Sequence, residues 1–530
     1  MKKNHEQRNS ISNVPEDKKE QLSNGKVPLN RRKFIGTVAS AGLGLTIVPR
    51  HVLGGVNRVA PSDKINLAYI GVGSQGLREI FDLLNVADFN VVAVCDPQEK
   101  AYSYHDWDPK SLRNKVREVL NDPDWTPPGN NSIPGGRTVG KQVVDAWYSR
   151  NNTGYKGCRT YSDFRDLFAK EKDLDAVKVM TPDHLHGIIA MAAIKRGIHV
   201  VMHKPLSTKF MEGREVVEMA KKSKVITHLI PWDTNGSMDQ VMKWINEGQI
   251  GTLKEIHNWT HRPVWPQYDF IPTETPPVPD GFNWDLWLGP EAFRPYHPHY
   301  TNMTFRSWYD FGGGSFSDVG YYSLWTVFKA LELEHPVLID PYFTHICEIK
   351  NNEVASVVNN NYSYPTASRV RFKYPAKGSR PAVDLIWYDG GMKPPVPEEF
   401  YDTDQPFPRE GMMFVGDKGK IISSFHVGNP QIITRDFKFL GDKQDGNPVA
   451  GNEKLHGIQI FANACKSGQQ TGGSFPEAMH ICDASTLYSV ALRSGKTLKL
   501  DSRNGKIINQ PELNSMLSRQ YRDGWSPESL

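Results

Sequence analysis

The sequence has few of the features that define several protein classes. Its five cysteines include no Cys-x-x-Cys pair, so neither a zinc site nor a disulfide framework is indicated. No apolar run is long enough to cross a bilayer comfortably. The net charge is only +4 and there is no basic stripe, so a nucleic-acid partner is not expected. What remains is an ordinary globular composition, 38% hydrophobic and 23% charged, in a chain with room for two or three domains.

The most informative stretch is a glycine-rich loop between two expected strands. Residues 64–70 are apolar and partly β-branched, which predicts a buried parallel strand. The loop Gly71-Val-Gly-Ser-Gln-Gly76 follows, and apolar residues at helical spacing predict a helix over 77–84. A second strand, 90–95, ends at Asp96. Strand, Gly-x-Gly-x-x-Gly, helix, strand and acidic residue, in that order, are typical of a dinucleotide-binding unit.

Each loop residue has a physical role in this interpretation. Gly71 allows the tight turn, Gly73 lets the backbone approach a pyrophosphate, and Gly76 lets the helix pack closely on the strand. The helix N-terminus, with Ser74 and Gln75, faces the phosphates. The alternative is that these glycines form only a tight turn in some other α/β protein.

The acidic residue after the second strand indicates which cofactor to expect. Asp96 lies 20 residues beyond Gly76, about where a carboxylate meets the hydroxyls of the adenosine ribose. Because a carboxylate repels a 2′-phosphate, we expect NAD, with NADP less favoured.

Strands and helices alternate again beyond residue 158. We expect a helix over 161–170, a strand over 175–180, a helix over 184–196 and a strand over 199–203. This alternation predicts a doubly wound parallel sheet. Residues 97–158 form an insertion with helices near 111–120 and 141–148, which we interpret as a lid, an oligomer contact or a surface loop.

Strands dominate the second half of the chain. Helices are expected over 210–223 and 238–247, and strands over 225–231, 254–261, 337–349, 353–364, 368–374, 382–388 and 412–424. This predicts an α+β domain with a largely antiparallel or mixed open sheet, one face of which meets another subunit in a homo-oligomer. The predicted divisions are a signal and linker (1–60), a Rossmann domain (61–205), an α+β domain (206–500) and a C-terminal tail (501–530).

The first 60 residues predict export. A polar, lysine-rich segment precedes Arg31-Arg32-Lys33-Phe34, and a mildly apolar run follows to Val48. This pattern resembles a twin-arginine signal, so we expect a periplasmic protein without a stable membrane span after processing. The alternative is a buried or surface helix that follows a polar tail.

Residues 257–325 are rich in aromatic side chains. They hold six of the thirteen tryptophans, namely Trp259, Trp265, Trp284, Trp287, Trp308 and Trp325. Flat aromatic faces suit stacking on sugar rings, which favours a small carbohydrate as the ligand. We expect most of these rings to pack a long loop onto the sheet and two or three to contact the ligand.

Three motifs together resemble the Gfo/Idh/MocA oxidoreductase family. They are the glycine loop, the segment 175–182 ending in Thr181-Pro182 with His186 following, and the segment 197–205 ending in His203-Lys204-Pro205. The resemblance covers roughly residues 63–500. It implies that Thr181, Pro182, His186 and Lys204 contribute to the cofactor site, with Lys204 beside the nicotinamide and the reacting hydroxyl. The family usually has Glu-Lys-Pro where this chain has His203-Lys204-Pro205.

A fourth motif departs further from the family. The usual Asp-x-Gly-x-His-x-x-Asp appears here with Asp318 and Gly320, but with Tyr322 for the histidine and Trp325 for the last aspartate. A tyrosine at this place is found in the glucose-fructose oxidoreductase branch, which also carries a twin-arginine signal. The resemblance implies that Tyr322 is the acid/base residue. We expect the Lys204 charge to lower its pKa, and Asp318 to orient the lysine or the substrate.

The resemblance implies an exported NAD(P)-dependent oxidoreductase with a tightly bound cofactor, acting on a carbohydrate or polyol hydroxyl. One alternative is an NAD-dependent glycosidase or lyase that works by transient ring oxidation and elimination, and another is a non-catalytic carbohydrate-binding protein on the same fold. The histidine pairs at 184/186, 257/261 and 297/299 lack accompanying carboxylates, so we expect no metal site.

Overall fold

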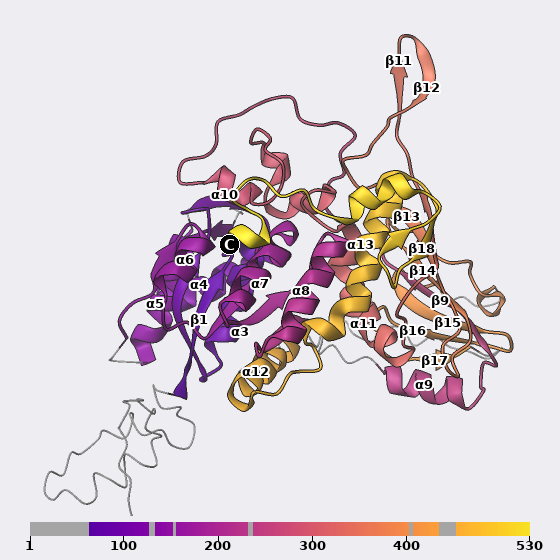
Figure 1. Ribbon diagram of the computed structural model, residues 1–530, viewed down its shortest axis with the longest axis horizontal. Helices are drawn as coiled ribbons and strands as arrows, with labels where there is room; N and C mark the ends of the chain where they lie inside the picture. Colours follow the sequence, from indigo (N-terminus) through magenta and orange to yellow (C-terminus); the bar gives the residue numbers. More distant parts are fainter. Residues whose placement is uncertain (1–62, 127–132, 152–154, 232–236, 402–405, 434–451) are drawn as a thin grey trace, which may run out of the picture. The chain divides into compact units, whose positions relative to one another are not determined.

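The computed structural model describes residues 63–126, 133–151, 155–231, 237–401, 406–433 and 452–530. The expected export signal lies outside these residues. Two large sheets, one of six strands and one of nine, organise the described part of the chain (Figure 1). None of its helices combines the length and the apolar character that a membrane crossing requires.

The six-stranded sheet is parallel throughout and has the order β5-β2-β1-β6-β7-β8. Its strands are β1 (Ile65–Ile70), β2 (Phe89–Cys95), β5 (Arg159–Tyr161), β6 (Ala176–Val179), β7 (His199–His203) and β8 (Thr227–Ile230). The predicted doubly wound sheet is confirmed, although the short strand β5 was not predicted and ends at Tyr161, where the expected helix begins. Through β8 the sheet continues past residue 205, where the boundary of this domain was predicted.

Helices pack against this sheet because its central strands are apolar on both faces. They include α3 (Ser74–Leu84), α6 (Phe164–Lys170), α7 (His186–Lys195), α8 (Phe210–Lys222) and, from far along the chain, α12 (Asn452–Ser467). Helix α12 joins the core of this domain, where Phe461 stacks on Phe89 with 6.2 Å between ring centroids. Residues from the end of the chain therefore complete the first domain.

The insertion contains the two predicted helices and a small sheet. Its elements are β3 (Ala101–Tyr104), α4 (Pro109–Leu120), β4 (Ile133–Gly135) and α5 (Arg137–Asn151), and β3 pairs with β4. The backbone N–H of Gly136 donates to the carbonyl of Val72 (2.8 Å), and the Ser74 hydroxyl donates to the carbonyl of His105 (2.5 Å). The segment 101–108, which we call the strap, therefore lies against the glycine loop.

The nine-stranded sheet has the order β17-β16-β15-β9-β14-β13-β10-β18-β19. Its strands are β9 (Leu253–Trp259), β10 (Leu338–Phe343), β13 (Ser368–Tyr374), β14 (Val383–Tyr388), β15 (Gly411–Gly416), β16 (Lys420–Ser423), β17 (Gln431–Ile432), β18 (Leu498–Asp501) and β19 (Lys506–Ile507). Strands β9 and β14 are parallel, and the other pairs in the described sheet are antiparallel. The predicted α+β domain with a mixed sheet is confirmed.

The strand expected over 337–349 divides into two. β10 stays in the large sheet, whereas β11 (Cys347–Lys350) pairs with β12 (Glu353–Val357) in a separate hairpin (Figure 1). Asn351 and Asn352 form its turn with φ values of 53° and 66°, the left-handed conformation that asparagine tolerates well. The single strand expected over 337–349 therefore ends before a hairpin whose turn is made by these two asparagines.

The helices of the second domain are α9 (Met238–Asn246), α10 (Trp284–Leu288), α11 (Tyr321–Ala330) and α13 (Met479–Ser494). Helix α13 was not predicted. It packs against α8, α11 and β10 and is buried along most of its surface, so its sequence lacks the one-sided apolar pattern of a surface helix.

The expected C-terminal tail is docked on the same chain. Arg519 is buried and its guanidinium donates to Glu212 on α8 (2.7 Å). Trp525 packs under the guanidinium of Arg165 on α6, 4.1 Å from the ring centroid. The C-terminus accordingly lies beside α6 and α7 (Figure 1), and Lys195 on α7 donates to the carbonyl of Pro527.

Candidate active site

Most of the predicted site residues lie together at one edge of the parallel sheet. The glycine loop follows β1, Thr181 and Pro182 follow β6, and Lys204 follows β7. Because these strands are neighbours and parallel, their carboxyl ends meet at the edge where α/β proteins bind ligands.

The glycine loop has the tight geometry that its sequence predicted. Gly71 has a φ of +96°, and a Cβ there would lie 2.6 Å from the backbone carbon of Met180. A Cβ on Gly76 would lie 2.3 Å from the carbonyl oxygen of Gly71. No side chain caps helix α3, and its first turn holds no acidic residue, so its N-terminus suits an anion such as a phosphate.

Gly73 has an unexpected neighbour in the strap. A Cβ on Gly73 would lie 3.1 Å from a ring carbon of Tyr104, and a Cβ on Gly135 would lie 2.5 Å from the other side of the same ring. The ring is therefore held between two glycines. It lies where a Cβ on Gly73 would point.

Asp96 stabilises the glycine loop directly. It is buried, and its carboxylate oxygens accept hydrogen bonds from the backbone N–H groups of Val72 (2.7 Å) and Gln98 (2.8 Å). Burial raises the pKa of Asp96 to about 6, although both N–H donors favour the charged form. Its predicted contact with a ribose stays a prediction.

His186 joins the ends of two strands. Its Nδ1 lies 2.6 Å from the carbonyl oxygen of Pro205, and its Nε2 lies 2.9 Å from that of Thr181. Burial lowers the pKa of His186. Pro182 directly precedes a short 3₁₀ turn, Asp183–Leu185. His186 therefore positions the segments that carry Thr181 and Lys204.

These residues fit a nicotinamide dinucleotide. The Thr181 hydroxyl is buried and has no hydrogen-bond partner among the described residues, so it is available to a ligand. The uncapped start of α3 would hold the phosphates, with Ser74, Gln75 and Gly76 in its first turn. Asp96 and Lys204 lie at the ends of β2 and β7, on the same edge of the sheet.

Lys204 belongs to a buried group of three charges. Its Nζ donates to Asp318 Oδ1 (2.7 Å), which also accepts from Nε of Arg306 (3.1 Å). Burial alone would raise the pKa of Asp318, but Lys204 and Arg306 hold it well below its usual range. Burial also lowers the pKa of Lys204. The predicted pairing of Asp318 with Lys204 is present, whereas no signal in the sequence indicated Arg306.

Tyr322 has a different partner from the one expected. Its hydroxyl lies 3.0 Å from Nε2 of His203, whereas Nζ of Lys204 lies 5.4 Å from the centroid of its ring. Burial, together with Glu79 and Asp318, raises the pKa of Tyr322 well above its ordinary value. The expectation that Lys204 lowers this pKa is therefore wrong: Lys204 is neutralised by Asp318, and burial favours the neutral phenol.

The six tryptophans of residues 257–325 are all buried, and the most exposed of them, Trp287, is only 6% exposed. Several pack together: the rings of Trp284 and Trp287 stack with 4.9 Å between centroids. Most of these rings therefore pack the core, as expected, and the expectation that two or three aromatics of this segment contact a ligand stays a prediction. Trp107, in the strap, is 51% exposed and lies over Arg262, 4.4 Å from the guanidinium carbon to the ring centroid. Arg262 acts electrostatically on both Asp318 and Tyr322, so Trp107 is an exposed aromatic at the margin of this site.

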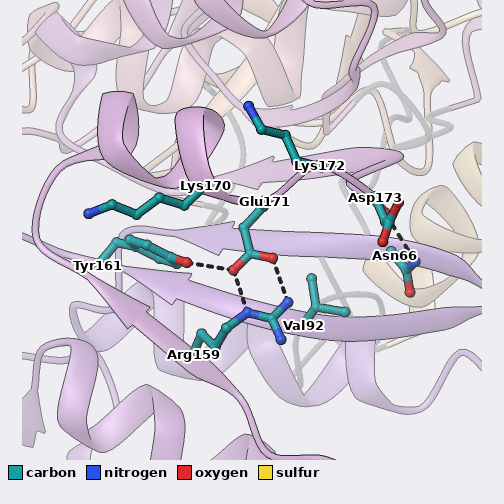
Figure 2. Close-up of a pocket in the computed structure, with 8 residues that line it drawn as sticks. All are labelled: Asn66, Val92, Arg159, Tyr161, Lys170, Glu171, Lys172 and Asp173. Carbon is teal, nitrogen blue, oxygen red and sulfur yellow. Dashed lines mark hydrogen bonds and ion pairs between the residues drawn. The ribbon is translucent and has the colours of Figure 1, made fainter.

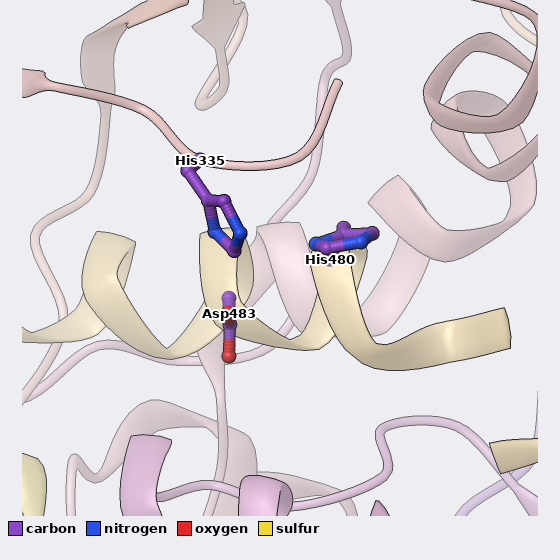
Figure 3. A group of neighbouring side chains, drawn as sticks. All are labelled: His335, His480 and Asp483. Carbon is purple, nitrogen blue, oxygen red and sulfur yellow. The ribbon is translucent and has the colours of Figure 1, made fainter. Parts of the chain in front are cut away.

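One group of possible metal ligands occurs elsewhere in the described residues. His335, His480 and Asp483 place ligand atoms within 4.8 Å of one another (Figure 3). Asp483 is already paired with Arg214 (2.7 Å), and the pKa of His335 is lowered first by burial and then by Arg214, Arg503 and Lys377. Positive charge around the group therefore opposes a cation. The histidine pairs noted in the sequence are not part of it.

A pocket on the first domain lies away from these residues (Figure 2). Its floor includes Asn66, near the start of β1, and Asp173, which precedes β6. Glu171 crosses it and pairs with both Arg159 (2.5 Å) and the hydroxyl of Tyr161 (2.7 Å). Because it opens near the amino end of the strands, we do not assign it to the cofactor.

Two family models match successive parts of the chain. One, described as an oxidoreductase family with an NAD-binding Rossmann fold, matches residues 142–230. The other, described as the C-terminal alpha/beta domain of an oxidoreductase family, matches residues 238–340. The two matches meet where the parallel sheet ends.

Individual relatives match shorter parts. A levoglucosan dehydrogenase of Pseudarthrobacter phenanthrenivorans is 30% identical over 112 residues, which are 20% of this chain and 28% of that protein. A glycosyl hydrolase family 109 protein of Saccharopolyspora erythraea is 24% identical over 244 residues, 43% of this chain and 44% of that protein. The chain thus spans less than half the length of these curated relatives.

Solved structures resemble the chain over a larger share of its length. The WlbA dehydrogenase of Bordetella pertussis, solved with NADH and UDP-GlcNAcA, is 13% identical, with a TM-score of 0.47 over 82% of this chain and 99% of that one. The two consecutive family matches, on the parallel sheet and at the start of the mixed sheet, are both to the Gfo/Idh/MocA oxidoreductase family, which residues 142–230 and 238–340 of this chain therefore resemble.

Proposed function

We propose that this protein is an NAD(P)-dependent oxidoreductase that acts on a hydroxyl group of a carbohydrate or polyol. The observation that carries the proposal is the meeting of Lys204, Asp318 and Tyr322 beside the glycine loop, although they come from two different domains. When bound, the cofactor supplies the hydride acceptor. We favour NAD over NADP because of Asp96. The levoglucosan dehydrogenase among the relatives supports a sugar as the substrate.

The charged groups of the site give each residue a role. Lys204 is buried and held in place by Asp318, so it can position a substrate hydroxyl and stabilise an alkoxide. Tyr322 keeps its proton near neutral pH, because its pKa is raised. Tyr322 can donate its phenolic proton to a substrate carbonyl that is being reduced. It can accept a proton from a substrate hydroxyl only if it passes its own phenolic proton to another group.

A second candidate is a glycosidase or lyase without net redox change. The relative that matches the largest share of this chain among those described is the family 109 glycosyl hydrolase. In such a reaction a ring hydroxyl is oxidised, the neighbouring C–H becomes acidic, a substituent is eliminated and the ring carbon is reduced again. The same lysine and tyrosine serve both outcomes.

Export, tight cofactor binding, membership of the glucose-fructose oxidoreductase branch and homo-oligomerisation are further parts of the proposal. Arg31-Arg32 and Tyr322 support export, tight cofactor binding and membership of the glucose-fructose oxidoreductase branch. The β11–β12 hairpin supports an oligomer, because it is separate from the large sheet and exposes Ile349 (75%) and Val354 (77%). Replacing Arg31 and Arg32 with lysine should retain the protein inside the cell, and continued export would point to another signal.

The proposed function can be tested on the purified protein. The released nucleotide is identified by mass spectrometry, and a panel of sugars is added while absorbance of the reduced nicotinamide is followed. We expect a bound or readily bound NAD and a sugar-dependent absorbance change that is nearly absent in Tyr322→Phe. A protein that binds sugars without any absorbance change or cleavage would instead be the non-catalytic carbohydrate-binding protein.

A further inference from the structure

A chain of buried polar groups continues behind Tyr322. His203 Nε2, 3.0 Å from the Tyr322 hydroxyl, also lies 3.3 Å from Glu79 Oε1. The other oxygen of Glu79 lies 2.8 Å from Nζ of Lys178. The side chains of His203, Glu79 and Lys178 are 8%, 3% and 0% exposed. The chain therefore runs from the site into the core of the first domain.

Stability alone does not explain these residues. Taking an ion pair out of water costs several kcal/mol per ion, and apolar side chains of similar volume are often at least as stabilising. Lys178 interrupts the otherwise apolar strand β6, and Glu79 is a buried acid on α3. Four elements, α3, β6, β7 and α11, each contribute one member. The arrangement ends at the one phenol that the proposed reaction uses.

Lys204 cannot take the proton of this phenol. An ammonium group has no lone pair to accept a hydrogen bond, and Lys204 already donates to Asp318. The imidazole of His203 can accept at Nε2 when its proton is on Nδ1. Among the contacts of the Tyr322 hydroxyl that the structure gives, this is the one with a basic atom.

We propose that His203 is a positioning residue that relays protons: it takes the phenolic proton of Tyr322 as Tyr322 takes the proton of the substrate hydroxyl, while Glu79 stabilises the imidazolium. This rests on the proposed function. The substrate O–H bond breaks and an O–H bond forms on Tyr322, whose own O–H bond breaks as an N–H bond forms at Nε2. The cofactor, when bound, would accept the hydride, so the alcohol becomes a carbonyl and one proton remains on His203. Reduction reverses each step.

Glu79 favours this transfer through its position. Its Oε1 faces the nitrogen that gains the proton, so their attraction is strongest after the transfer. Gln75 donates to the same oxygen (3.0 Å) and Lys178 pairs with the other, so Glu79 keeps a fixed place. The remaining charged or titratable groups around Tyr322 and His203 are Lys204, Asp318, Arg306, Arg262 and His426. The cations oppose a charged imidazole, and Asp318 favours it.

The test compares the wild-type enzyme with His203→Gln and with a matched control, His199→Gln. His199 lies on the same strand, at the other end, and accepts from the backbone N–H of Ile226. Glutamine keeps a polar contact but cannot carry the proton. We expect His203→Gln to lower kcat for sugar oxidation about 10²–10⁴-fold, with KM within a few fold, and to lose the fall in kcat at low pH. The control should behave as wild type.

A second measurement does not depend on activity or on the folding of that variant. In ¹⁵N-histidine-labelled wild-type protein, the imidazole signal that moves in Tyr322→Phe should show an unprotonated Nε2. Glu79→Gln should lower the pKa of that signal. A proton on Nε2, or an unchanged titration in Glu79→Gln, would overturn the relay.

The two proposals fail in different ways. A wild-type protein that oxidises or cleaves no sugar overturns the proposed function, and the relay with it. An active wild type whose His203→Gln variant keeps kcat within threefold, with the same pH profile, overturns the relay alone. A loss confined to KM would likewise show a binding role and contradict the relay.

Discussion

Replacing Asp318 with asparagine should destabilise the protein more than replacing the lysine it contacts. Asp318 is 7% exposed and its Oδ1 is shared by Lys204 and Arg306. Without its charge, two cations stay buried without this counter-ion. In Lys204→Met, by contrast, Asp318 keeps its contact with Arg306.

The size of the effect follows from this difference. Breaking a buried pair so that a charge stays uncompensated costs about 3–5 kcal/mol. With an unfolding entropy of about 2.1 cal/mol/K per residue, the compact unit to which both residues belong, Arg58–Leu530, would lose roughly 3–5 °C in Tm. Lys204→Met should lose clearly less. Scanning calorimetry at pH 7 gives the Tm of the wild type and of both variants, and we expect the Tm of Asp318→Asn to be the lowest of the three.

The charge of Asp318 also determines how the stability difference between wild type and Asp318→Asn depends on pH. The pKa of Asp318 in the folded protein lies below its unfolded value of about 3.9, so its stabilisation is complete above that pH. It is lost as the pH falls through the folded pKa. The Tm difference between wild type and Asp318→Asn should therefore be largest near neutral pH and shrink below about pH 4. A Lys204→Met variant less stable than Asp318→Asn, or a difference that grows in acid, would refute this account.

Three further predictions concern the cofactor and the substrate. Gly73→Val should lose bound nucleotide, although the new side chain would also clash with Tyr104. The double variant Gly73→Val/Tyr104→Ala removes that clash and should still lack nucleotide. Recovery of nucleotide in the double variant would show that Gly73→Val had disturbed only the strap. Asp96→Asn, which keeps one acceptor for the loop N–H groups, should raise the use of NADP relative to NAD in steady-state assays; an unchanged preference would place Asp96 away from the ribose. Trp107→Ala should raise KM for the sugar roughly 2–13-fold, the equivalent of about 0.5–1.5 kcal/mol of aromatic stacking; an unchanged KM would exclude Trp107 from the site.

The sequence predicted those elements of the fold whose residue pattern is set by neighbouring residues along the chain. The glycine loop, α3 and the parallel strands were visible because period, glycine spacing and burial agree over residues 64–96. Helix α13 was missed because a helix buried on most sides has no polar face to reveal its period. The docking of residues 501–530 depends on the pairing of Arg519 with Glu212, which no local pattern contains.

The candidate site shows the same division. Lys204, Asp318 and Tyr322 were identified from motifs, and the first two are in contact. The pKa of Tyr322 was predicted in the wrong direction, because the sequence does not show that Asp318 neutralises the lysine or that His203 reaches the phenol. Lys178, within an apolar strand, and His203, where the family usually has glutamate, were the visible signs of the buried chain behind the site.

Transfer of a labelled hydride tests the central proposal most directly. The protein is incubated with NAD and with sugars that carry deuterium on the ring carbons, and the nucleotide and sugar products are analysed by mass spectrometry. A net oxidoreductase should place one deuterium on the nicotinamide of the reduced cofactor, and a redox-neutral glycosidase should return it to the cleaved sugar. Tyr322→Phe should show neither. Two results would contradict oxidation at this site. One is sugars that are bound but give no deuterium to the nicotinamide, and the other is sugars that are cleaved without exchange of deuterium for solvent hydrogen at the carbon next to the one oxidised.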